Sequence, residues 1–101
     1  MLYRDDQTIG AYQSEAAENL RALASRLRVV EAGVESSDAD MRIKNQKELD
    51  DLNWRLKEIE TKLGELVTSD ENEWEARRLE IDTEINQLGH DIENAITLVG
   101  G

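Results

Sequence analysis

Apolar residues recur at alternating spacings of three and four along nearly the whole chain, and this heptad pattern restricts the fold more than any other feature. Such a spacing places the residues on one stripe of an α-helix. An isolated stripe would be exposed to water, so each helix is expected to pack against another helix. The apolar residues form three seams: Ile9, Ala16, Leu20, Leu23, Leu27, Val30 and Val34; Leu49, Leu52, Leu56, Ile59, Leu63 and Leu66; and Trp74, Ile81, Ile85, Leu88, Ile92, Ala95 and Val99. The first and third seams each contain one polar exception, Gln13 and Arg78 respectively.

The first break in the heptad register follows Val34 and predicts a turn between the first two helices. Gly33 suits the left-handed conformation that often closes a helix. Ser36 or Ser37 is then expected to cap the next helix. The negative charges of Asp38 and Asp40 are favourable there, because the N-terminal end of a helix dipole is positive.

The second break falls at residues 67–70, where the seam slips by one position before Trp74. Thr68 with Glu71 and Asp70 with Glu73 both have the spacing of a capping box. With no Pro in the chain to interrupt them, the expected helices cover about residues 6–32, 37–67 and 70–98.

These three helices of similar length predict an all-α single domain over residues 1–101, folded as an antiparallel three-helix, up-down-up bundle with coiled-coil heptad packing. In that topology the first and third helices run parallel, so Tyr12 is expected near Trp74. One alternative stands because Gly10 and the small Ala16 weaken the first seam. In it, residues 37–98 form a long helical hairpin that dimerises into a four-helix bundle.

The chain is strongly acidic, with a net charge of −11. Residues 68–101 hold nine acids against only Arg77 and Arg78, a net charge of −7. Such a surface repels phosphate groups, so neither direct nucleic-acid binding nor membrane binding is expected. The N-terminus lacks the pattern of a secretory signal, and no stretch approaches the roughly 20 apolar residues of a membrane span. We therefore expect a soluble, cytoplasmic protein.

The sequence offers little that could carry chemistry. It holds one histidine, His90, and no cysteine, and its glycines do not form a phosphate-binding loop. Metal sites in helical bundles use inward-facing Glu residues with Glu-x-x-His motifs, whereas Gln87 stands three residues before His90 and the seams contain no carboxylate. We expect no catalytic residues, cofactor or metal site, and thus no enzyme.

Trp54 is the most informative single residue for a binding function. It lies opposite the seam of its helix, so its ring either covers another helix or stands exposed as an anchor for a partner, a role in which Trp is enriched. Ile43, eleven residues earlier, lies on nearly the same face of this helix as Trp54. The apolar C-terminal turn and the acidic third helix complete the predicted partner-binding set, which is Trp54, Ile43, Ile96, Leu98, Glu80, Glu84 and Asp91.

Three functions remain open at this point. The first is a non-catalytic interaction module, such as an adaptor, assembly chaperone or accessory subunit, that binds a protein with a basic surface. The second is an acidic inhibitor that occupies a basic nucleic-acid-binding surface of a partner protein. The third is a coiled-coil spacer that associates with itself as a homodimer or larger homo-oligomer.

Overall fold

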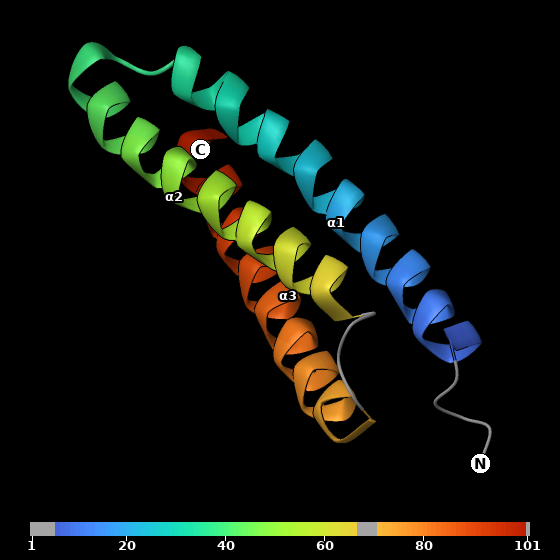
Figure 1. Cartoon of the computed structure of the whole chain (residues 1–101). Coiled ribbons are helices and arrows are strands. Elements are labelled where there is room, and N and C mark those ends of the chain that lie inside the picture. The colour runs from blue at the N-terminus through green and yellow to red at the C-terminus, as the bar shows by residue number, and fades with distance from the viewer. Residues whose placement is uncertain (1–5, 67–70, 101) are drawn as a thin grey trace.

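The heptad seams fold into three α-helices in the computed structural model: α1 (Asp6–Glu35), α2 (Ala39–Glu65) and α3 (Glu71–Gly100). The structure describes the backbone of residues 6–66 and 71–100, and the side chains of residues 10–66 and 73–98. The helices pack lengthwise into a bundle of 57 × 17 × 16 Å, in which α3 runs parallel to α1 and antiparallel to α2 (Figure 1). The predicted all-α three-helix bundle is confirmed.

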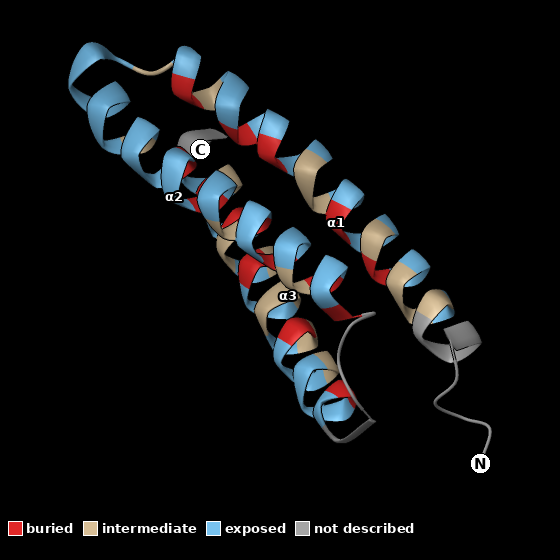
Figure 2. Ribbon diagram, in the orientation of Figure 1, coloured by how far each residue is buried: buried red, intermediate tan, exposed pale blue. Residues whose placement is uncertain are grey.

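The core consists of the residues that the heptad spacing selects. Every described side chain of the second seam, from Leu49 to Leu66, is buried, and Figure 2 shows the buried positions of each helix turned toward the other two. No polar or charged residue is buried among the described side chains. Full burial of an aliphatic side chain contributes about 1.5–3 kcal/mol, so the seams account for most of the stabilisation of the fold.

The turn between α1 and α2 differs from the prediction at Gly33. No described glycine has a positive φ, and α1 continues through Gly33 to Glu35. Ser36 and Ser37 do not cap α2, because their hydroxyls donate hydrogen bonds of 2.8 Å to carbonyls of the preceding turn. The last carbonyls of a helix lack intrahelical donors, and a hydroxyl four residues later reaches them.

Asp38, just before α2, and Arg42, in its first turn, complete this connection. Asp38 occupies the N-cap position with an extended backbone and makes no side-chain capping bond. Arg42 reaches back and donates to the carbonyls of Glu35 at 3.2 Å and Ser37 at 3.3 Å. The start of α2 therefore closes the end of α1, which reverses the predicted direction of capping. The predicted second turn at residues 67–70 and its capping boxes lie outside the described residues.

The first helix completes the bundle within the chain. Gln13, the polar exception in the first seam, donates a hydrogen bond of 2.8 Å to the carbonyl of Leu63 on α2. Leu23 places its Cδ2 3.5 Å from the position that a Cβ would take at Gly89 on α3. Because α1 packs against both other helices, residues 37–98 do not stand alone as the hairpin of the alternative arrangement. Within the described segments, no helix is long and apolar enough to cross a membrane.

Candidate partner-binding site

Trp74 closes one end of the bundle. It is 5% exposed, and its ring meets that of Tyr12 edge to face with 6.1 Å between centroids. The Arg78 guanidinium lies 5.4 Å from the centre of the indole ring, within the range of a cation–π interaction. Tyr12 donates a hydrogen bond of 2.6 Å to Asp82, and its pKa is raised by burial and by this bond. The predicted meeting of Tyr12 and Trp74 is confirmed, and both side chains belong to the fold.

Trp54 lies in the opposite environment. It is 61% exposed on α2, so the interpretation that its ring covers another helix is wrong. Ile43, which is 75% exposed, lies eleven residues earlier, close to three helical turns. The two side chains therefore leave α2 on nearly the same side, about 16 Å apart along the helix. They are exposed large apolar side chains on the outward face of α2, with charged residues around them.

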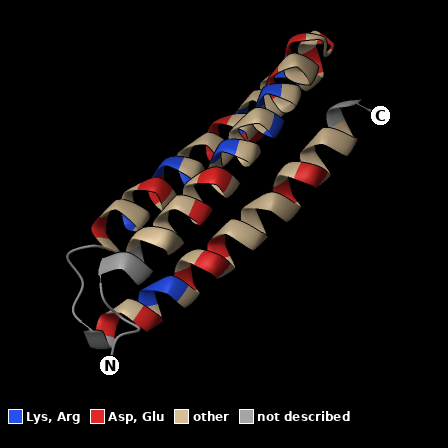
Figure 3. Cartoon of the chain, turned by 90° about the vertical axis from the view of Figure 1, so that its right-hand side faces the viewer, with Lys and Arg blue, Asp and Glu red and all other residues tan. Residues whose placement is uncertain are grey.

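The predicted acidic residues of α3 are engaged with α2. Lys62 pairs with Glu84 at 2.6 Å and with Glu80 at 3.1 Å, and Arg55 pairs with Asp91 at 2.8 Å. The hydrogen bonds that Lys62 donates to Glu84 and Glu80 raise the pKa of Lys62 to about 12, and the bond that Glu80 accepts from Lys62 lowers the pKa of Glu80. Figure 3 shows α3, which ends at the C label, with acidic residues along its length and basic ones only near its start. These three acids therefore act first as links between helices.

The two predicted binding residues of the apolar C-terminal turn differ in their exposure. Ile96 is half-buried and packs against the core, whereas Leu98 is 72% exposed. Leu98 borders a groove of about 300 Å³ between α2 and α3, which Glu48 and Asp51 also line. Sequence reasoning named Leu98 but missed this groove, because the two acids become its neighbours only through the offset between the helices.

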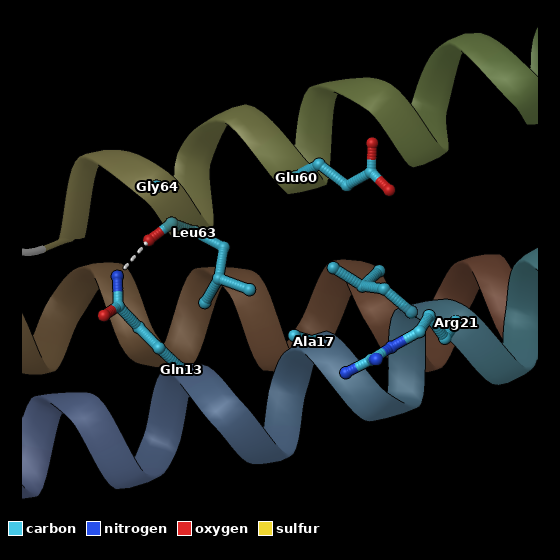
Figure 4. Close-up of a pocket in the computed structure, with 7 residues that line it drawn as sticks. Gln13, Ala17, Arg21, Glu60, Leu63 and Gly64 are labelled. Atoms are coloured by element: carbon cyan, nitrogen blue, oxygen red, sulfur yellow. Dashed lines mark hydrogen bonds between the residues drawn. The ribbon is translucent and has the colours of Figure 1, made fainter.

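A second groove, of about 390 Å³, lies between α1 and α2 (Figure 4). Ala17 and Leu63 contribute apolar surface to it, and at Gly64 an added Cβ would meet nothing within 4 Å. Figure 4 shows Arg21 and Glu60 at its edge on different helices. The groove can accommodate an apolar side chain, but its lining holds no nucleophile or histidine. The sequence signal for it was the pair of small residues, Ala17 and Gly64, and their juxtaposition required the structure.

The described residues contain no group of three or more His, Cys, Asp or Glu side chains that could hold a metal ion. His90 is exposed on α3, two residues after the buried Leu88. Comparison with known proteins adds no relative: no family model matches the sequence, and no curated protein or solved structure gives a significant match.

Proposed function

We propose that this chain is a non-catalytic, cytoplasmic protein-interaction module that binds a protein partner through the outward face of α2. The observation that carries the proposal is the 61% exposure of Trp54 on a regular helix whose opposite side is buried in the core. Tryptophan is among the residues that contribute most to protein–protein binding. Its large ring exposes much apolar surface to water in the free protein, and binding removes that surface from water.

The surroundings of Trp54 fit an anchor better than an extended apolar patch. Lys47, Asp50 and Lys57 are exposed on the same side of α2. A ring of polar residues around a central aromatic side chain is the usual arrangement of a protein interface. Ile43 provides a second, smaller apolar contact on this face.

Affinity capture from the native host, followed by mass spectrometry, tests the proposal. A partner retained by the wild type should be lost with Trp54→Ala, with a reduction in affinity of about thirtyfold or more, as for a typical interface anchor. Leu79→Ala is the matched control, because Leu79 is 58% exposed but lies on α3. Circular dichroism must show that both variants remain folded. Capture that is unchanged by Trp54→Ala would contradict the proposal.

The salt dependence of the same capture separates this function from the acidic inhibitor. An anchor that buries apolar surface keeps its partner at about 1 M salt, where the Debye length is about 3 Å. An inhibitor that mimics nucleic acid through its carboxylates loses its partner there. Glu84 and Asp91 are already paired with cations of α2, which supports the anchor rather than the inhibitor.

A further inference from the structure

The ion pairs between α2 and α3 follow the heptad repeat. Lys62 pairs with Glu84, and Arg55, seven residues earlier, pairs with Asp91, seven residues later. Because the helices are antiparallel, each heptad back along α2 corresponds to one heptad forward along α3. The next step in this series brings Glu48 level with Leu98. At this third position an acid faces a leucine, so no ion pair forms.

A groove of about 300 Å³ lies at this third position. Leu98 borders it with 72% of its surface exposed, and the buried Leu52 also lines it. Glu48 makes no ion pair or hydrogen bond with any described residue. Asp51 reaches Arg55 only at 3.8 Å, while Asp91 holds the same guanidinium at 2.8 Å. The groove therefore combines the apolar side chains of Leu52 and Leu98 with the unpaired Glu48 and the weakly paired Asp51. Arg55, Asp91 and Asn94 complete its lining, and the charges of Arg55 and Asp91 balance each other in their ion pair.

We propose that this groove binds an arginine or lysine side chain of the protein partner, which supplies the cation missing from the third position. The charged head lies between Glu48 and Asp51, and the aliphatic stem packs against Leu98. A long basic side chain satisfies both features, since its stem is apolar and its head forms charge-assisted hydrogen bonds with carboxylates. An acidic side chain would be repelled, and a purely apolar one would cover Glu48 without a counter-charge.

Two further observations support a basic partner. The net charge of −11 accelerates the encounter with a positively charged segment. Asp51 lies three residues before Trp54, which is one helical turn away, so a single partner segment can reach both the groove and the anchor. This inference rests on the proposed function, because it names the chemistry of the partner that Trp54 would hold.

The test uses a synthetic probe, the acetylated and amidated tetrapeptide Leu-Arg-Arg-Leu, with Leu-Glu-Glu-Leu as its counterpart. In a ¹⁵N-labelled protein, the arginine peptide should shift the amide signals around Glu48, Asp51 and Leu98, and the glutamate peptide should not. Glu48→Gln should weaken binding of the arginine peptide about threefold to tenfold. Glu18→Gln removes the same charge from the exposed surface of α1 and should change the affinity by less than twofold. Equal effects of the two substitutions would mean that only net charge attracts the peptide, and would overturn the proposal.

Leu98→Lys provides a second, independent variant. Its ammonium group is expected to reach Glu48 from within the chain, occupy the groove and abolish the peptide-induced shifts there. Leu98→Gln, which brings no charge, should retain them. Both variants should stay folded, because Leu98 is largely exposed. Peptide-induced shifts that persist in Leu98→Lys would overturn the groove proposal. The proposed function is tested separately, and it fails if Trp54→Ala leaves partner capture unchanged.

Discussion

The two tryptophans of the chain lie in opposite environments, although both are on regular helices. Trp74 occupies a seam position, is 5% exposed and contacts Tyr12 on another helix. Trp54 lies opposite its seam, is 61% exposed and has charged neighbours on its own helix. The heptad position thus decides whether the same side chain stabilises the fold or remains available to a partner. Trp74 should matter for folding, and Trp54 should matter for binding.

The largest expected effect is the loss of stability in Trp74→Ala. Removal of a buried tryptophan leaves a cavity and also removes the ring contacts with Tyr12 and Arg78, at a cost of about 3–5 kcal/mol. Urea denaturation would measure this change in the free energy of unfolding. Trp74→Phe, which keeps an aromatic ring, should lose considerably less. A loss below about 1 kcal/mol in Trp74→Ala would contradict a core role for this residue.

Tyr12→Phe separates the ring contact with Trp74 from the hydrogen bond to Asp82. The ring remains, so we expect a smaller loss of about 1 kcal/mol at neutral pH. Burial and the bond to Asp82 raise the pKa of Tyr12 above its ordinary value of 10.0, so the folded state keeps a proton that the unfolded chain loses. The contribution of the hydroxyl is therefore complete below pH 10 and is lost as the pH rises further.

Denaturation of the wild type and Tyr12→Phe at several pH values checks this sign. The difference in their unfolding free energies should be constant from pH 7 to pH 9 and should shrink above pH 10. A difference that grows above pH 10 would show that the hydroxyl is not held in its protonated form.

Gly64→Ala examines another exposed position of α2. A Cβ added at Gly64 meets nothing within 4 Å, so only helix propensity changes, and we expect a gain of up to about 1 kcal/mol. Gly89→Ala is the comparison within α3, where the new Cβ comes within 3.5 Å of Leu23, an ordinary contact. Thermal unfolding of both variants should show raised midpoints. A lowered midpoint in Gly64→Ala would indicate that the groove beside it is narrower in solution.

The smallest expected effect on stability is that of Trp54→Ala. Trp54 is 61% exposed and is not part of the buried core, so its truncation should change the unfolding free energy by less than about 0.5 kcal/mol. Fluorescence adds a direct comparison: in Trp74→Phe only Trp54 emits, and in Trp54→Phe only Trp74 emits. Acrylamide should quench the emission of Trp54 much more strongly than that of Trp74. Similar quenching of the two would show that their environments do not differ as the structure has them.

The sequence was sufficient to predict the helices, their packing and the contact between Tyr12 and Trp74. Burial followed the heptad spacing because a helix at the surface of a bundle buries only one stripe of its residues. In an up-down-up bundle the first and third helices run in the same direction, and this brings Tyr12 close to Trp74. Leu23 and Ile85 are predicted members of the first and third seams, yet both are only half-buried, so the spacing alone does not determine how deeply each seam residue is buried.

Other features required coordinates. Ser37 lies between two helix ends, and its hydroxyl can cap the next helix or bond back to the previous one, so the sequence does not fix the choice. The position of Trp54 opposite the seam did not reveal whether another helix lay across it. The partners of Glu84 and Asp91 depend on the offset between α2 and α3, which a heptad count within one helix does not determine.

The up-down-up order of the helices also has a mechanical consequence. Asp6 at the start of α1 and Gly100 at the end of α3 lie toward opposite ends of a bundle 57 Å long (Figure 1). A pulling force applied through these two residues therefore acts along the helix axes, and the seams must slide past one another over many contacts at once. A hairpin of two helices would instead be opened from its free end, one contact after another. We expect this chain to resist tension along its axis more strongly than such a hairpin.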